Sequence, residues 1–310
     1  MLPNTQKSSI LLTGATGFLG GALLRKILAS QRSVIAVVRP NSQINRLSDV
    51  INNSNFKLVG REPEQLEDVF RCGDISVIIH TATEYGRGES TIADILEANL
   101  ILPIRIAELG VKYGARGFIN TDSYFNKKGR SYSNLMNYSL SKQTLLVWLE
   151  KISTDINIAN MSLEHMYGPY DSRAKFVEAM IQAIAIEQQP SVKLTHGHQK
   201  RDFIYLDDVV ESYMYVLMEI ESQNFKYINF EIGSGSSVTV KDFVTLISKV
   251  SGSPTQLDFG SIDYRDDEIM SSKADIRGIC GLGWSPKTTP IEGITKILKK
   301  YKITQNGKGF

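Results

Sequence analysis

Three glycines near the start of the chain constrain its fold more than any other feature. Residues 10–20 read ILLTGATGFLG, with Gly14, Gly17 and Gly20 between an apolar run and a stretch of helical spacing. Gly14 permits a tight turn, Gly17 lets a pyrophosphate approach the backbone, and Gly20 lets the helix pack close to the sheet. The first helical turn offers N–H donors to phosphate oxygens. The segment predicts a dinucleotide-binding strand–loop–helix unit; an unliganded glycine turn is the alternative.

Short apolar runs alternate with amphipathic stretches through the first half of the chain. Strand-like runs occur at 9–13, 34–38, 77–80, 118–121 and 156–163, and helical spacing occurs at 17–29, 92–113 and 138–153. This alternation predicts an α/β fold of the Rossmann type, a doubly wound parallel sheet of about seven strands with helices on both faces. After about residue 165 the helical stretches at 174–188, 208–221 and 241–251 are separated by loops, which indicates a smaller and less regular lobe.

Composition excludes several classes of protein. The chain carries 35 Lys+Arg and 33 Asp+Glu, a net charge of +2, whereas nucleic-acid binders usually carry a clustered basic excess. Cys72 and Cys280 form no CxxC pattern, and the four histidines form no HExxH zinc motif. No uncharged apolar run approaches the ~20 residues that span a bilayer. We therefore expect a cytoplasmic protein without membrane insertion, nucleic-acid partner or metal.

The end of the second strand-like run bears on the choice of cofactor. An acid at this position accepts hydrogen bonds from the adenosine ribose and favours NAD, whereas an arginine pairs with a 2′-phosphate and favours NADP. This run ends VVRP at 37–40, and no Asp or Glu lies between Val34 and Leu47. Arg39 therefore predicts NADPH over NADH, unless it only caps a solvated strand end.

A tyrosine and a lysine, Tyr138 and Lys142, stand four residues apart in a helical stretch, so both side chains lie on one helix face. A free tyrosine titrates near pH ~10, and a neighbouring ammonium should lower that pKa. This pair predicts that Tyr138 passes a proton to a carbonyl oxygen while Lys142 also holds the nicotinamide ribose. Thr121, after the run 117–119, can hydrogen-bond the same oxygen; an ordinary strand-to-turn segment is the alternative.

Seven motifs spread over almost the whole chain carry a family resemblance. They are TGATGFLG (13–20), IIHTATEYG (78–86), NTDSYF (120–125), YSLSK (138–142), LEHMYGP (163–169), RDFIYLDDVV (201–210) and DYRDDEIM (263–270). Together they resemble the extended short-chain dehydrogenase/reductase family that modifies nucleotide sugars, and within it the 4-ketoreductases of CDP-linked dideoxyhexoses. The resemblance implies NADPH-dependent reduction at C4 of a nucleoside-diphosphate-4-keto-6-deoxy or 3,6-dideoxy hexose, for deoxysugar and lipopolysaccharide O-antigen precursor synthesis.

The resemblance also implies a role for each residue that matches a family motif. The catalytic residues are Thr121, Ser123, Tyr138 and Lys142, with Thr121 as the main hydroxyl. The cofactor-binding residues are Gly14, Thr16, Gly17, Phe18, Leu19, Gly20, Arg39, His80, Thr81, Ala82, Asn99, Tyr138, Lys142 and His165. The substrate-binding residues are Thr83, Thr121, Ser123, His165, Lys175, Phe176, Arg201 and Arg265, of which the two arginines would grip the diphosphate.

The expected organisation follows from the same resemblance. A cofactor domain would comprise residues 1–165, with 202–232 returning to it, and a nucleotide-sugar lobe would comprise 166–201 and 233–310. The helices expected near 92–113 and 138–153 are exposed on one side in this fold, and Leu145, Leu146 and Trp148 place apolar surface on more than one helix face. These features predict a homodimer through a four-helix bundle.

Two other functions have to be weighed. An NAD-retaining nucleotide-sugar 4-epimerase or 4,6-dehydratase uses the same triad, but the dehydratases carry Thr-Asp-Glu where this chain has Thr121-Asp122-Ser123. The acid that would remove the C5 proton is missing here, and Arg39 also speaks against this class. A non-enzymatic NADPH-binding relative would usually have lost Tyr138 or Lys142, and both are present.

Overall fold

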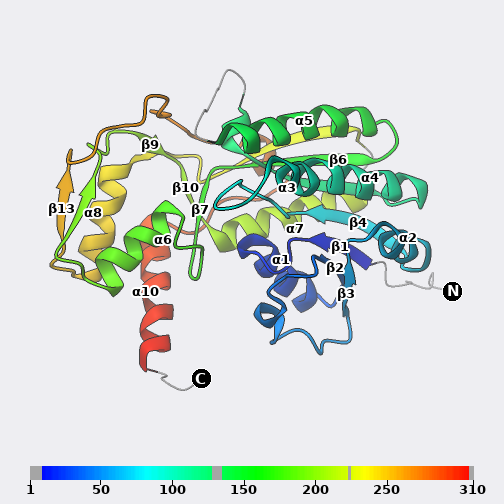
Figure 1. Cartoon of the computed structure of the whole chain (residues 1–310), viewed down its shortest axis with the longest axis horizontal. Helices are drawn as coiled ribbons and strands as arrows, with labels where there is room; N and C mark the ends of the chain where they lie inside the picture. The colour runs from blue at the N-terminus through cyan, green and yellow to red at the C-terminus, as the bar shows by residue number, and fades with distance from the viewer. Residues whose placement is uncertain (1–8, 128–134, 223–224, 307–310) are drawn as a thin grey trace. The chain divides into compact units, whose positions relative to one another are not determined.

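The computed structural model describes residues 9–127, 135–222 and 225–306, with side chains up to residue 301. The chain divides into two compact units. Unit 1 comprises Met1–Ser162 and Val210–Phe230, and unit 2 comprises Leu163–Val209 and Glu231–Phe310. Figure 1 traces the elements of both along the chain.

Unit 1 is built on a seven-stranded sheet with the order β11-β6-β5-β4-β1-β2-β3. Parallel pairs join β1 to β2 and β4, β2 to β3, and β4 to β5. The run β3-β2-β1-β4-β5-β6 is the strand order of the doubly wound Rossmann fold, which confirms the predicted fold class. The strands are β1 (Ser9–Thr13), β2 (Ser33–Val38), β3 (Phe56–Gly60), β4 (Ile75–His80), β5 (Gly117–Ser123), β6 (Asn157–Leu163) and β11 (Tyr227–Ile232).

Helices cover both faces of this sheet (Figure 1). Apolar side chains of α2, α4 and α5 pack on one face in a cluster that includes Phe118, Ile106 and Leu145. On the other face α7 approaches so closely that a Cβ at Gly117 would collide with Ile220. The helices of this part are α1 (Phe18–Ala29), α2 (Pro63–Cys72), α3 (Ile92–Leu96), α4 (Leu102–Lys112), α5 (Met136–Ile152) and α7 (Leu206–Ser222).

The helix expected over 92–113 is interrupted. A π-helical turn, Glu97–Ile101, separates α3 from α4. Pro103 stands at the start of α4, and a proline ring clashes with the carbonyl four residues before it in a regular α-helix. That carbonyl belongs to Asn99, so the wider turn accommodates the ring.

The region 56–72 holds β3 and α2, neither of which the sequence patterns predict. Only Phe56 of β3 is buried, because the strand lies at the edge of the sheet. In α2 the buried residues are Leu66 and Phe70. Single apolar residues at such spacing are a weak periodic signal.

Unit 2 is smaller and is assembled from short strand pairs and helices, as expected for the second lobe. Strands β7 and β10 pair in parallel, β8 and β13 pair in parallel, and β9 and β12 pair antiparallel. Its apolar core brings together Tyr167, Phe203 and Phe243 with residues of α6 and α10. The elements are β7 (His165–Tyr167), α6 (Phe176–Met180) with a π-helical turn at Ile181–Ile186, β8 (Ser191–Leu194), β9 (Lys200–Arg201), β10 (Phe203–Tyr205), β12 (Val238–Thr239), α8 (Val240–Ser251), β13 (Gln256–Phe259), α9 (Arg277–Cys280) and α10 (Pro290–Asn306).

A helix that crosses a bilayer is about 20 residues long and predominantly apolar. Within residues 9–127, 135–222 and 225–306, no helix is both long and apolar enough to cross one.

Candidate cofactor and active site

The glycine-rich loop joins β1 to α1 and has the geometry that a dinucleotide requires. Gly14 has φ +74°, and a Cβ there would lie 2.6 Å from the Thr81 hydroxyl and 2.7 Å from the Ala82 amide nitrogen. A Cβ at Gly20 would collide with the Gly14 carbonyl. Gly17 is the N-cap of α1 and has no side chain to cap its first turn. The backbone therefore forms an open cradle that fits a pyrophosphate.

The ends of β1 and β4 are tied together beneath this loop. The Thr13 hydroxyl lies 2.8 Å from His80 Nδ1 and accepts hydrogen bonds from the amides of Thr81 and Ala82, each at 3.2 Å. Thr81 in turn donates its hydroxyl to the Thr13 carbonyl at 2.7 Å. His80 is fully buried, and burial holds its pKa well below the usual value. A neutral His80 thus supports the loop from below.

Arg39 follows β2, as the sequence predicts, but the fold gives it an acidic neighbour. A guanidinium nitrogen of Arg39 lies 3.8 Å from a carboxylate oxygen of Glu84, and the Arg39 side chain is 60% exposed. The Ser42 hydroxyl accepts a hydrogen bond from the Arg39 amide at 2.9 Å. Arg46, from the same connection, reaches the Thr16 carbonyl at 3.3 Å. The sequence rule missed Glu84 because it stands 45 residues away.

Tyr138 and Lys142 lie on the buried side of α5. The Lys142 ammonium donates to the Thr121 carbonyl at 2.8 Å. Burial lowers the pKa of Lys142 to about 8, while the nearby Asp122 carboxylate acts in the opposite direction. Asp122 is buried at the end of β5, and desolvation raises its pKa. The structure thus adds an acidic partner to the predicted pair.

The expected lowering of the Tyr138 pKa is wrong for this structure. Burial raises the pKa of Tyr138 well above the usual value, and the neighbouring Tyr85 and Asp122 act in the same direction. A hydrogen bond with the Ser123 side chain acts against them. The Lys142 ammonium is directed at the Thr121 carbonyl instead. The phenol is therefore held neutral.

The two candidate hydroxyls on β5 have different neighbours. Thr121 Oγ1 lies 2.8 Å from the Tyr213 hydroxyl, which belongs to α7. Ser123 is the residue whose side chain shares a hydrogen bond with Tyr138. Its hydroxyl also accepts a hydrogen bond from the Phe125 amide at 3.4 Å. Ser123 thus acts on the ionisation of the phenol, whereas Thr121 is paired with the Tyr213 hydroxyl.

Asn99, in the π-helical turn, connects three segments around Tyr138. Its amide nitrogen donates to the Glu84 carbonyl at 2.8 Å and to the Ser141 hydroxyl at 3.0 Å, and its oxygen accepts from the Glu84 amide at 2.8 Å. Ser141 donates to the Tyr138 carbonyl at 2.8 Å. Asn99, which the resemblance places among the cofactor-binding residues, thus binds the backbone of the segment after β4.

A row of polar side chains crosses β5, β6 and β11; its members on β5 and β6 are buried, and Asn229 on β11 is exposed. Asn120 donates to Asn160 at 2.7 Å, and Asn160 donates to Asn229 at 2.7 Å. Asn160 and Ser162 also donate to the Asp122 carboxylate, at 3.3 and 3.4 Å. In the sequence, this network is visible only as polar residues at alternate positions of two apolar runs, 118–122 and 158–162. It fixes the carboxylate that faces Lys142.

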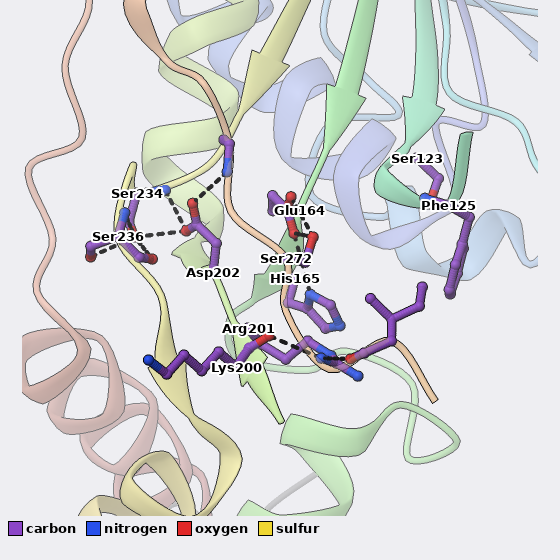
Figure 2. A network of polar contacts seen from close by, with 12 residues as sticks. Ser123, Phe125, Glu164, His165, Lys200, Arg201, Asp202, Ser234, Ser236 and Ser272 are labelled. Atoms are coloured by element: carbon purple, nitrogen blue, oxygen red, sulfur yellow. Dashed lines mark hydrogen bonds and ion pairs between the residues drawn. The ribbon is translucent and has the colours of Figure 1, made fainter. Parts of the chain in front are cut away.

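In unit 2, Arg201 lies on β9 and donates to the Lys200 carbonyl at 2.9 Å (Figure 2). Its guanidinium donates to the Ile269 carbonyl and pairs with the Glu268 carboxylate, and the residue is buried. His165, half-buried on β7, has its Nδ1 3.7 Å from the Glu164 carboxylate, yet desolvation lowers its pKa. Both Glu164 oxygens accept from the Ser272 hydroxyl at 2.7 Å.

The remaining residues expected to bind substrate in unit 2 lie at its surface. Lys175 Nζ lies 3.2 Å from the Asp171 carboxylate, at the N-cap of α6, and Phe176 begins that helix with an exposed ring. Arg265 is also exposed. Asp202, which no motif reading singled out, accepts hydrogen bonds from the amides of Ser234 and Ala274 at 2.7 and 3.1 Å (Figure 2).

Comparison with known families and sequences agrees with this geometry. The NAD dependent epimerase/dehydratase family matches residues 10–233. CDP-abequose synthase from Salmonella typhimurium is 35% identical over 302 residues, which cover 95% of this chain and 98% of that protein. CDP-abequose synthase from Salmonella muenchen is 33% identical over 294 residues, which cover 93% and 96%.

Solved structures show the same fold at lower sequence identity. The UDP-glucose 4-epimerase of Thermotoga maritima superimposes with a TM-score of 0.82 at 20% identity, covering 96% of this chain and 99% of that one. The dTDP-glucose 4,6-dehydratase of Bacillus anthracis gives a TM-score of 0.79 at 18% identity, covering 97% and 98%.

Proposed function

Because the chain belongs to the NAD dependent epimerase/dehydratase family, we propose that it is an NADPH-dependent 4-ketoreductase of a nucleotide sugar. The substrate class is a nucleoside-diphosphate-4-keto-6-deoxy or 3,6-dideoxy hexose, with a CDP-linked sugar as the first candidate. Likeness to CDP-abequose synthase over nearly the full length of both chains supports this choice. An enzyme of this kind belongs to deoxysugar and O-antigen precursor synthesis.

The proposed direction of reaction rests on two residues: Ser123 stands where the dehydratases carry the acid that removes the C5 proton, and Arg39 favours NADPH. A reductase needs a proton donor when the substrate binds, whereas an epimerase or dehydratase begins by oxidising the sugar and needs a base. Burial raises the pKa of Tyr138, so the phenol carries its proton when the substrate binds. In the proposed step, the carbonyl carbon accepts a hydride, the oxygen accepts the Tyr138 proton, and solvent reprotonates the phenolate.

The cofactor would be held by the glycine cradle and by residues around it. NADPH, when bound, supplies the hydride. The backbone of 14–20 would accept the pyrophosphate, Arg39 the 2′-phosphate and Lys142 the nicotinamide ribose. The open first turn of α1 and the exposed Arg39 side chain support this assignment. Ser123 and Thr121 would hydrogen-bond the carbonyl oxygen.

The nucleotide-sugar contacts are proposed for two groups of residues. Thr83, Thr121 and Ser123 would contact the sugar. His165, Lys175, Phe176, Arg201 and Arg265 would contact the nucleotide diphosphate. Arg201 would exchange its Glu268 partner for phosphate oxygens, since a guanidinium fork pairs equally well with either.

NADPH oxidation against a panel of CDP-, dTDP-, GDP- and UDP-4-keto-6-deoxy sugars tests the proposal. We expect turnover with at least one member and preference for a CDP-linked one. Absence of turnover with every member, while NADPH still binds, would overturn the reductase assignment.

A second candidate is an NAD-retaining 4-epimerase, because the fold places an acid beside Arg39. Glu84 could accept hydrogen bonds from an adenosine ribose, the role that an acid after β2 has in NAD-binding enzymes. Denaturing the purified protein distinguishes the two candidates. Release of stoichiometric NAD would favour the epimerase, and its absence together with NADPH turnover would favour the reductase.

We also propose that the chain forms a homodimer through α3, α4 and α5. Leu145 faces the core of unit 1, but Met136, Leu140, Val147 and Trp148 of α5 are exposed, as are Ile92, Leu96 and Ile101 of the neighbouring segment. Exposed apolar side chains grouped on neighbouring helices are typical of an interface, and a second copy would cover them symmetrically. Sedimentation that shows only monomer at micromolar concentration would contradict this.

A further inference from the structure

Tyr85 forms part of the surroundings of the proton donor but belongs to no predicted site. Its ring is stacked on that of Tyr138, with centroids 5.0 Å apart and planes inclined by 27°. Phe125 approaches the Tyr138 ring edge-on, at 6.4 Å and 86°. Tyr138 is buried, whereas Tyr85 is half-buried. The Tyr138 ring therefore contacts two aromatic rings, of which that of Tyr85 is stacked on one of its faces.

The backbone that carries Tyr85 is held by the π-helical turn Glu97–Ile101, which in turn contacts the helix that carries Tyr138. Asn99 forms two hydrogen bonds with the Glu84 backbone, each of 2.8 Å, and a third with Ser141. Ser141 donates to the Tyr138 carbonyl. On the other side, Gly86 has φ +70° and turns the chain immediately after Tyr85. The stacked ring thus has little freedom to move away.

We propose that Tyr85 is a positioning residue for Tyr138: its ring fixes the plane of the phenol and keeps water from that face. This inference rests on the proposed reductase function. A proton donor must lie within hydrogen-bond reach of the substrate oxygen, and small misplacements of a reacting group reduce turnover strongly. Tyr85 also favours the neutral phenol, because it raises the Tyr138 pKa.

Two substitutions separate the ring of Tyr85 from its hydroxyl. Tyr85→Phe keeps the stack, whereas Tyr85→Leu removes it and leaves an apolar side chain. We expect Tyr85→Leu to lower kcat on the order of ten- to a hundredfold with NADPH affinity unchanged. Tyr85→Phe should retain kcat within about twofold. Equal losses in the two variants, or none in Tyr85→Leu, would overturn the inference.

A matched control tests whether loss of any aromatic stack has the same effect. Tyr113 is stacked on Phe70 in the same unit, with centroids 6.4 Å apart and the same 27° inclination. Tyr113→Leu should lower the thermal midpoint as Tyr85→Leu does but leave kcat unchanged. A comparable loss of kcat in Tyr113→Leu would show that Tyr85 acts only through stability.

A second readout does not depend on turnover, and so separates failure of this inference from failure of the proposed function. In protein labelled with ¹³C-tyrosine, the Tyr138 signal is the one that disappears in Tyr138→Phe. We expect it to remain that of a neutral phenol up to about pH 10 in the wild type and to ionise at lower pH in Tyr85→Leu. Identical titrations would overturn the inference whether or not the chain reduces a nucleotide sugar.

Discussion

Unit 1 holds two cations that the proposed reaction needs, Lys142 and Arg39, and their surroundings are opposite. Lys142 is 1% exposed, donates to a backbone carbonyl at 2.8 Å and has the buried Asp122 as its acidic neighbour. The Arg39 side chain is 60% exposed, and its acidic neighbour Glu84 lies 3.8 Å away.

The difference indicates which cation can exchange its partner. A buried charge that loses its counter-charge is strongly destabilised, so the protonation of Lys142 depends on fixed groups of the protein. An exposed pair contributes only ~0–1 kcal/mol, so a phosphate can replace Glu84 at little cost. Lys142 suits a permanent catalytic role, and Arg39 suits a cofactor that binds and leaves in every turnover.

The largest effect is expected at Tyr138, on the same helix as the buried Lys142. Tyr138→Phe removes the proton donor and should lower turnover ~10²–10⁴-fold, while NADPH binding stays close to normal. Stopped-flow reduction and fluorescence titration measure the two quantities separately. Turnover equal to that of the wild type would mean that another group donates the proton.

Removing each of the two β5 hydroxyls, those of Ser123 and Thr121, tests which one acts on the substrate oxygen. Each variant removes one hydrogen bond to the developing alkoxide, and we expect a loss on the order of 10²-fold at most. Because Ser123 acts on the ionisation of Tyr138, whereas Thr121 Oγ1 lies 2.8 Å from the Tyr213 hydroxyl, Ser123→Ala should lose more activity than Thr121→Val. The sequence motifs alone predict the reverse order, so comparison of the two kcat values decides between them.

For the exposed cation, Arg39→Ala should weaken NADPH binding and leave NADH binding nearly unchanged. Loss of a charge-assisted contact with the 2′-phosphate costs ~1.5–3 kcal/mol, or about ten- to a hundredfold in Kd. Isothermal titration with both cofactors measures this difference. Equal losses for NADPH and NADH would show that Arg39 only supports the strand end.

The pH dependence should report the buried cation. Since the pKa of Lys142 is lowered to about 8, its positive charge is lost as the pH rises through that value, and kcat should fall there. The Asp122 carboxylate raises this pKa, so Asp122→Asn should move the falling limb to lower pH. A falling limb at the same pH in Asp122→Asn and in the wild type would show that Asp122 does not control the protonation of Lys142.

The smallest effect is expected for the exposed acid. Glu84→Gln removes the competitor of the 2′-phosphate and should strengthen NADPH binding by only about two- to fivefold, as the weakness of exposed ion pairs predicts. The gain should shrink at high salt. A loss of NADH binding instead would assign Glu84 to the adenosine ribose.

Local patterns predicted much of unit 1, and long-range contacts account for the rest. The glycine cradle and the position of Tyr138 and Lys142 on the buried face of α5 depend on spacings within one segment, so the sequence reveals them. The approach of Glu84 to Arg39 and the stack of Tyr85 on Tyr138 depend on the fold. The spacing of Tyr138 and Lys142 predicts a lowered Tyr138 pKa, but burial raises it, and burial depends on the fold.

The π-helical turn Glu97–Ile101 has a consequence for how this segment can vary between genes. Each residue rotates an α-helix by about 100°, so a one-codon deletion here would remove the extra residue of the wide turn and bring the Pro103 ring against the preceding turn. Asn99 would then point elsewhere and release the segment that carries Tyr85, while the rest of α4 remained helical. Single substitutions in this turn can therefore leave the direction of the following residues unchanged, whereas an insertion or deletion changes it.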